Sequence, residues 1–186
     1  MKLKYLLLAA ISGFIVTTDQ AAKIYIHTHF HLGESFVLIT NFFNLTYVRN
    51  PGAAFGFLAS SHPAFREMFF LSMPPIALLI ILAILRGIKD TDKFMAIALS
   101  LVFGGAVGNY IDRLHYGFVV DFLDFTIPYT NSQGVPQSWS WPAFNIADMG
   151  IVSGVCSLLF LELIKSKKPL DQSTPQDDAI ESAPRN

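Results

Sequence analysis

Four long apolar segments constrain this chain more than any other feature of its sequence. Residues 3–18 contain one charged side chain, Lys4, and residues 68–85, 94–111 and 149–161 contain none. A helix needs about 20 predominantly apolar residues to cross the hydrocarbon core of a bilayer. The pattern therefore predicts an all-α polytopic membrane protein with four transmembrane helices, at residues 3–25, 65–86, 94–112 and 145–164.

The composition also favours a membrane protein. Of the 186 residues, 52% are hydrophobic and 15% are charged, whereas soluble domains carry about 25% charged residues. The single cysteine, Cys156, excludes an internal disulfide and any multi-cysteine metal site.

The N-terminal sequence MKLK followed by an apolar run is also typical of a secretory signal peptide. However, no small-x-small cleavage site follows the run, and three further spans favour an uncleaved first helix.

Lysine and arginine residues predict the orientation, because cytoplasmic loops of membrane proteins are enriched in them. With the N-terminus inside, nine of them fall on the cytoplasmic side: Lys2, Lys4, Arg86, Lys89, Lys93, Lys165, Lys167, Lys168 and Arg185. Four fall on the other side: Lys23, Arg49, Arg66 and Arg113. Both termini are therefore expected in the cytoplasm.

The connections between the helices have different characters. Residues 35–48, SFVLITNFFNLTYV, are rich in β-branched and aromatic types and predict two short strands in a small extracytoplasmic sheet. The connection 113–144 contains Tyr116, Tyr129, Trp139 and Trp141, aromatic types that favour the bilayer interface. We expect a four-helix domain over residues 1–168 and a disordered, polar cytoplasmic tail over residues 169–186.

Polar residues gather at the predicted outer ends of the spans. Ionisable groups in or beside transmembrane helices are functional candidates by default, because the bilayer makes them costly. The candidates are Asp19, Lys23, Asn109, Asp112, Arg113, Asp121, Asp124, Asn145 and Asp148. A transporter would carry its polar site nearer the bilayer midplane, often with internal repeats. The rim position and the lack of a visible repeat favour an enzyme.

Structural interpretations compete with functional ones at several of these positions. Asp19 and Lys23 form an i,i+4 pair, worth about 0.3–0.5 kcal/mol if exposed. Asn145 or Asp148 can cap the fourth helix. The histidines of HTHFH, His27, His29 and His31, could bind metal from one strand face, but no further ligand is evident. GGAVG, residues 104–108, indicates close helix packing.

Two carboxylates at one apolar rim indicate acid–base chemistry. Asp side chains a few ångströms apart cannot both ionise easily, so they share a proton. The ionised member can take a proton from water, and the protonated member can donate one to a carbonyl under attack. Spacing alone leaves open whether Asp121 or Asp124 is the partner of Asp148.

Five motifs in order resemble one family. They are TDQAAK (18–23), RNPGAAFG (49–56), GGAVGNYIDR (104–113), GFVVDF (117–122) and FNIAD (144–148). Together they closely resemble bacterial lipoprotein signal peptidase, signal peptidase II, and they span the chain from the first to the fourth helix. The resemblance implies an aspartic endopeptidase of the bacterial cytoplasmic membrane. Such an enzyme cleaves diacylglyceryl-modified prolipoproteins before the lipidated cysteine.

The resemblance also implies residue roles. The family's catalytic pair corresponds to Asp121 and Asp148, and its supporting polar residues to Asp19, Lys23, Asn50, Asn109, Asp112, Arg113 and Asn145. Of these, Arg113 is expected to pair with Asp112. We expect no cofactor or metal, no nucleic-acid partner, and a monomer that works among membrane lipids. The connection between the two aspartates is longer than the family pattern suggests.

Overall fold

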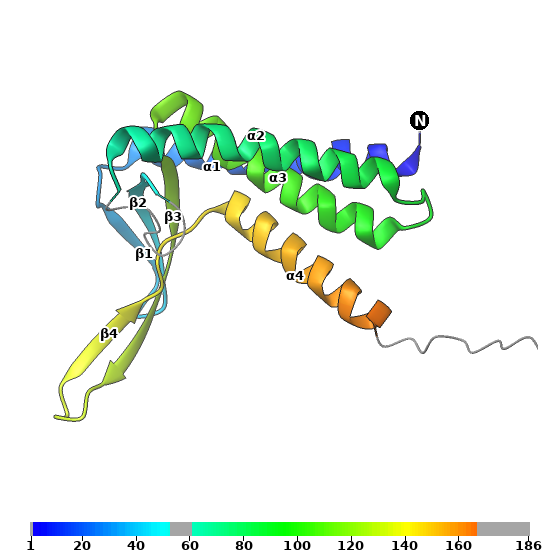
Figure 1. Cartoon of the computed structure of the whole chain (residues 1–186). Helices are drawn as coiled ribbons and strands as arrows, with labels where there is room; N and C mark the ends of the chain where they lie inside the picture. The colour runs from blue at the N-terminus through cyan, green and yellow to red at the C-terminus, as the bar shows by residue number, and fades with distance from the viewer. Residues whose placement is uncertain (1, 53–60, 167–186) are drawn as a thin grey trace, which may run out of the picture.

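The computed structural model describes residues 2–52 and 61–166, and its helices form an elongated bundle (Figure 1). The helices are α1 (Leu3–His29), α2 (Pro63–Gly87), α3 (Lys93–Tyr116) and α4 (Ile146–Ser166). Each is long and apolar enough to cross a membrane, so the prediction of four transmembrane helices is confirmed. The tail predicted to be disordered lies outside the described residues.

Two helices run further than their hydropathy predicts. α1 continues past residue 25 to His29, and α3 continues past residue 112 to Tyr116. No proline or glycine interrupts either extension, and α3 ends at Gly117 in the left-handed conformation, with φ of 76°. The polar residues that lower the hydropathy of these ends are therefore helical, and they carry much of the site described below.

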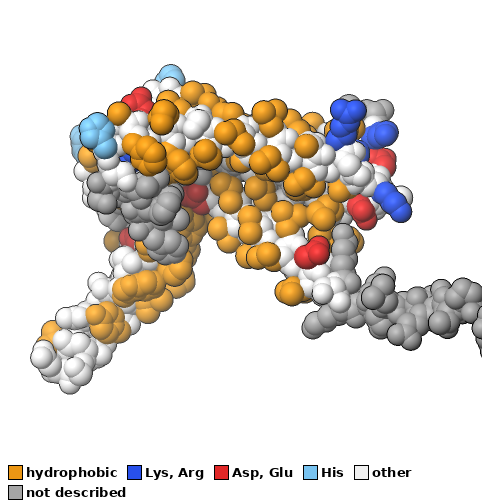
Figure 2. Space-filling model, viewed as in Figure 1, with side chains coloured by type: hydrophobic (Ala, Val, Ile, Leu, Met, Phe, Trp, Pro, Cys, Tyr) orange, Lys and Arg blue, Asp and Glu red, His pale blue; other side chains and the backbone are white. Residues whose placement is uncertain are grey.

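The surface of the bundle is apolar, as lipid contact requires. Large side chains such as Phe14, Leu79 and Val152 are exposed, and Figure 2 shows hydrophobic side chains along the helices, with charges gathered near the ends. α3 is the central helix, because 44% of its apolar window is buried inside the protein against 11% for α2.

Glycines in the middle of α3 allow α1 and α4 to approach its backbone. A Cβ added at Gly104 would lie 2.8 Å from the Ser12 Cα of α1. One added at Gly105 would lie 2.2 Å from the Ala147 carbonyl oxygen of α4. Real Cβ atoms do not come this close to backbone, so the interpretation of GGAVG as a helix-packing sequence is confirmed.

Replacing Gly105 should therefore destabilise the bundle. In Gly105→Ala the new methyl group forces α4 away from α3, and we expect a loss of about 1–3 kcal/mol, as for other overpacked cores. Thermal unfolding of the purified protein in detergent measures the effect. Gly13→Ala is the matched control, because nothing lies within 4 Å of its added Cβ. Equal melting temperatures for the two variants would contradict close packing as the role of Gly105.

The end of the bundle that carries the N-terminus is closed by reciprocal contacts. The backbone N–H groups of Leu3 and Lys4 donate to the Asp90 carboxylate, which lies between α2 and α3. The Lys4 ammonium in turn donates to the carbonyl oxygens of Arg86 and Ile88, at 2.9 and 2.7 Å. These bonds satisfy free backbone groups at the start of α1 and the end of α2.

A four-stranded antiparallel sheet lies at the opposite end of the bundle (Figure 1). Its strands, in sheet order, are β1 (Ser35–Ile39), β2 (Phe43–Asn50), β3 (Val119–Thr130) and β4 (Pro136–Ser140). The first two confirm the predicted strands, whereas β3 and β4 were not predicted. β3 pairs with β2 through its first half and with β4 through its second half.

Candidate active site

Apart from Asp124, the polar residues predicted from the sequence meet where the helices join the sheet. Asp19 and Lys23 lie late in α1, Asn109, Asp112 and Arg113 late in α3, and Asn145 and Asp148 at the start of α4. Asp121 lies near the start of β3, and Asn50 ends β2. Residues separated by more than 120 positions in the sequence therefore share one hydrogen-bond network.

A fully buried ion-pair network lies at the base of the site. The Lys23 ammonium lies 2.8 Å from the Asp19 carboxylate, 3.0 Å from the Asp112 carboxylate and 2.9 Å from the Asn109 side-chain oxygen. An ammonium has three donors, so all of them have partners here. Lys23 is 1% exposed and both carboxylates are 0% exposed. The i,i+4 pair expected from the sequence is present, but it is buried and includes a third charge.

This network holds the backbone beside both candidate catalytic residues. Asp112 accepts a 3.0 Å hydrogen bond from the Val120 N–H, one residue before Asp121. Asp19 accepts a 2.8 Å hydrogen bond from the Ala147 N–H, one residue before Asp148. Removing one member of a buried ion pair leaves an uncompensated charge. The network therefore positions β3 and α4 relative to each other.

Gln20 also belongs to this network, although it is not among the site residues predicted from the sequence. Its amide nitrogen donates to the Asp112 carboxylate at 2.9 Å and to the Gly108 carbonyl oxygen at 3.1 Å. Its position next to Asp19, at the polar end of an apolar helix, was the available signal. A neutral polar side chain in such a place needs a hydrogen-bond partner within the protein, as a charged one does, because lipid satisfies neither.

Asp121 is a buried carboxyl group that is hydrogen-bonded to two asparagine side chains. It is 2% exposed, and it accepts hydrogen bonds from the Asn50 and Asn145 side-chain amides at 3.0 and 2.7 Å. Burial, together with the nearby charge of Asp148, raises the pKa of Asp121 to about 7. A substantial fraction of Asp121 therefore carries a proton at neutral pH, unlike an ordinary aspartate.

Asp148 caps α4 and also faces the site. Its backbone N–H donates to the Asn145 side-chain oxygen at 2.9 Å, and its carboxylate accepts from the Asn145 backbone N–H at 3.2 Å. This reciprocal pair is a capping box, with aspartate in the usual place of glutamate. The other carboxylate oxygen accepts a 2.7 Å hydrogen bond from the Asn109 side-chain amide. The capping interpretation of Asn145 and Asp148 is therefore confirmed.

Two asparagines connect the carboxyl groups. The Asn145 amide nitrogen donates to both the Asp121 carboxyl and the Asn109 side-chain oxygen, at 2.7 and 3.2 Å. Asn109 then donates to Asp148. The chain Asp121–Asn145–Asn109–Asp148 continues to Lys23, so the carboxyl groups and the buried ion pairs form one connected set.

Arg113 lies beside this set rather than within the ion pairs. Its guanidinium donates to the Gly52 carbonyl oxygen at 3.0 Å and stacks over the Phe70 ring at 4.8 Å. The prediction that Arg113 pairs with Asp112 is wrong, because within residues 2–52 and 61–166 the ion partner of Asp112 is Lys23.

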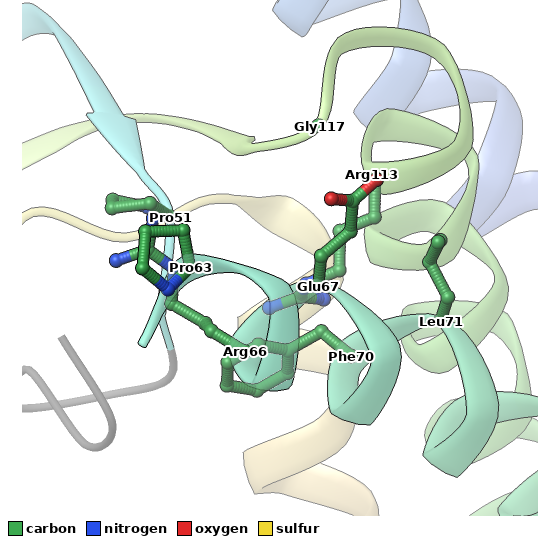
Figure 3. A pocket seen from close by; sticks show the side chains of 8 residues that line it. All are labelled: Pro51, Pro63, Arg66, Glu67, Phe70, Leu71, Arg113 and Gly117. Atoms are coloured by element: carbon green, nitrogen blue, oxygen red, sulfur yellow. The ribbon is translucent and has the colours of Figure 1, made fainter. Parts of the chain in front are cut away.

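A cavity of about 210 Å³ opens next to Arg113 (Figure 3). Its lining comes from the end of β2, the start of α2 and the end of α3: Pro51, Pro63, Arg66, Glu67, Phe70, Leu71, Arg113 and Gly117. The cavity lining is therefore a mixture of apolar and charged side chains.

Asp124 and the histidines lie outside the connected set. Asp124 is three residues after Asp121, so it points to the other face of β3, where it accepts a 3.0 Å hydrogen bond from Asn44.

The prediction that HTHFH forms a strand is wrong, because His27 and His29 are in α1. Their side chains are about 200° apart around the helix. His27 contacts the Tyr47 hydroxyl, and the part of the chain that the structure describes has no group of three metal-ligating side chains.

Comparison with known proteins identifies the family of this chain. A family model described as signal peptidase (SPase) II matches residues 11–165. The lipoprotein signal peptidase of Syntrophus aciditrophicus is 44% identical over 168 residues, which cover 90% of this chain and 98% of that protein. That of Desulforapulum autotrophicum is 39% identical, covering 87% and 94% respectively.

Solved structures show the same fold. A bacterial membrane enzyme determined at 2.3 Å resolution matches with a TM-score of 0.74 and 34% identity, covering 90% of this chain and 93% of the other. A second, at 1.9 Å resolution, matches with a TM-score of 0.71 and 34% identity over 84% of this chain. On sequence and fold together, this chain belongs to the signal peptidase II family.

Proposed function

We propose that this protein is an intramembrane aspartic endopeptidase that removes the signal peptide from diacylglyceryl-modified prolipoproteins, cleaving before the lipidated cysteine. The observation that carries the proposal is the buried Asp121 carboxyl, whose pKa is raised to about 7 and which is joined to Asp148 through two asparagines. Family membership supplies the peptidase activity, and these two carboxyl groups supply its chemistry.

The pKa of Asp121 suggests how the two carboxyl groups divide the work. Asp148, as the carboxylate, takes a proton from water while the water oxygen attacks the scissile carbonyl carbon. Asp121, as the acid, gives its proton to the carbonyl oxygen, so no oxyanion is left uncompensated in the apolar surroundings. The product of this step is a neutral gem-diol.

The second step restores both groups. Asp148 gives the proton it received to the nitrogen of the departing cysteine, and Asp121 takes back a proton from one gem-diol hydroxyl as the C–N bond breaks. The products are a carboxylic acid and an amine, and each aspartate has its starting protonation state. The scheme invokes no metal and no covalent intermediate.

The surrounding polar groups have positioning roles in this proposal. The two carboxyl groups accept hydrogen bonds from Asn50, Asn109 and Asn145, which fix the position of one group relative to the other. Lys23, Asp19 and Asp112 fix the backbone before each aspartate. Arg113 borders the cavity, where it can bind a substrate carbonyl. All these groups come from one chain, which supports action as a monomer in membrane lipid.

Cleavage of a defined precursor tests the function. The purified protein in detergent micelles should cut a diacylglyceryl-modified prolipoprotein peptide at a single bond, on the N-terminal side of the modified cysteine. Mass spectrometry identifies both fragments. Cleavage at another bond, or an intact precursor in the presence of folded protein, would show that this chain has a different substrate or activity.

The charge distribution supports placement in the bacterial cytoplasmic membrane, with both termini inside and the active site near the outer face. Nine lysine and arginine residues then lie inside and four outside. Reporter fusions after Asn131 and at the C-terminus should give activity on opposite sides of the membrane. Periplasmic alkaline phosphatase activity from the C-terminal fusion would overturn this orientation.

A further inference from the structure

A two-stranded arm projects from the sheet. It consists of residues 126–141, namely the second half of β3, a turn, β4 and Trp141. Figure 1 shows that the arm leaves the bundle at the end opposite the N-terminus and runs across the helix axes rather than along them. In a bilayer crossed by these helices, such a direction follows the membrane surface.

The arm has two chemically distinct faces. Residues paired across antiparallel strands share a face, and residues two apart along a strand do so too. One face carries Ile127, Tyr129, Gln137 and Trp139, and Trp141 extends it. The other carries Thr126, Pro128, Thr130, Pro136, Ser138 and Ser140. One face is therefore mainly aromatic and aliphatic, and the other carries small hydroxyl and proline side chains.

Side-chain contacts confirm these faces. On the first face the Tyr129 hydroxyl donates to the Gln137 side-chain oxygen, and the Trp139 and Trp141 rings meet edge to face at 5.7 Å. On the second face the Thr126 and Ser140 hydroxyl oxygens lie 3.1 Å apart. We call the first the aromatic face and the second the hydroxyl face.

The aromatic face is open along its length. Ile127, Tyr129, Trp139 and Trp141 are between 45% and 52% exposed. A two-stranded hairpin is marginally stable in water by itself, and a hydrophobic face normally needs something to cover it. Residues 125–147 contain no Lys, Arg, Asp, Glu or His, so the arm offers no charge to pair with a charged protein surface.

The chemistry of the aromatic face suits contact with a lipid surface better than contact with a protein surface. Tryptophan and tyrosine concentrate at membrane interfaces, where the ring is apolar and the N–H or O–H group reaches water or headgroups. The base of the arm is continuous with a bundle whose exposed surface is apolar, and Figure 2 shows hydrophobic side chains on both. An uncharged, one-sided ribbon at the end of a membrane-spanning bundle has the chemistry of an interfacial element.

We propose that the aromatic face of the arm binds the surface of the bilayer next to the bundle, with Ile127, Tyr129, Trp139 and Trp141 among the lipid headgroups and the hydroxyl face toward water. The arm is the segment that links Asp121 to Asp148. Its contact with lipid thereby ties the depth of both carboxyl groups to the position of the membrane surface.

The chain has two tryptophans, and both are on the arm. Fluorescence of the unmodified full-length protein in phosphatidylcholine vesicles therefore reports this face alone. We expect lipids brominated near the headgroup to remove most of the emission, and we expect acrylamide to quench it weakly. Quenching by acrylamide without quenching by lipid would overturn the proposal, since the face would then be in water. Resistance to both quenchers would also overturn it, since the face would then be covered by protein.

Two single-tryptophan variants test the orientation of the arm. In a Trp139→Phe, Trp141→Phe background, Ile127→Trp places a reporter on the aromatic face and Thr130→Trp places one on the hydroxyl face. The first should be quenched by brominated lipid and the second by acrylamide. Equal behaviour of the two reporters would show that the arm does not present one face to the bilayer.

Discussion

Asp121→Asn and Asp148→Asn should each reduce precursor cleavage by roughly a thousandfold or more, because general acid–base catalysis contributes about 10²–10⁴-fold per group. Asparagine keeps the shape of aspartate but neither takes nor gives a proton at neutral pH. The side-chain oxygen of asparagine at position 148 still accepts from the Asn145 backbone N–H, so the start of α4 is retained. Turnover of the lipidated peptide and the melting temperature of each variant should be measured together.

Asp124→Asn is the matched control for these two variants. Asp124 is on the same strand as Asp121, yet its carboxylate faces Asn44 rather than Asn145. We expect this variant to keep most of the activity and the stability. Inactive Asp124→Asn together with active Asp121→Asn would reverse the assignment. Loss of folded protein in all three would instead indicate a structural role for the carboxyl groups.

Cleavage should also depend almost wholly on the lipid attached to the substrate cysteine. The cavity next to Arg113 is about 210 Å³, below the ~300 Å³ at which small-molecule pockets usually begin. Each CH₂ buried in the bilayer contributes about 0.8 kcal/mol, so two acyl chains hold the cysteine firmly at the membrane surface. Position in the lipid then brings the scissile bond to Asp121 and Asp148.

Three peptides of one sequence test this dependence at equal concentration in the same micelles. One carries the diacylglyceryl group, one carries an unmodified cysteine, and one carries an S-methyl cysteine that blocks the thiol without adding acyl chains. We expect rapid cleavage of the first peptide and no measurable cleavage of the others. Equal rates for all three would remove the lipid as the source of specificity. Cleavage of the S-methyl peptide alone among the unlipidated ones would assign specificity to the thiol.

Hydropathy was enough to predict the membrane architecture, because a bilayer imposes one physical length on every span. The four predicted helices are all present, although α1 and α3 continue beyond their apolar segments. The strands over residues 35–50 followed from β-branched and aromatic content. β3 has a similar signal in VVDFLDFTI, although two aspartates interrupt it. β4, with the sequence PQSWS, has little β-branched content and forms by pairing with the second half of β3.

Local sequence patterns identify the residues that are available to the site: the polar side chains at the ends of apolar helices, and the cap of α4. How these residues are used depends on which of them the fold brings together. Pairing of β2 with β3 and the alternation along β3 place Asp121 with Asn145 and leave Asp124 with Asn44. Close packing at the α3 glycines buries Lys23 between two carboxylates and leaves Arg113 at the cavity. These outcomes depend on contacts between residues far apart in the chain, and local patterns of hydropathy and charge contain no information on such contacts.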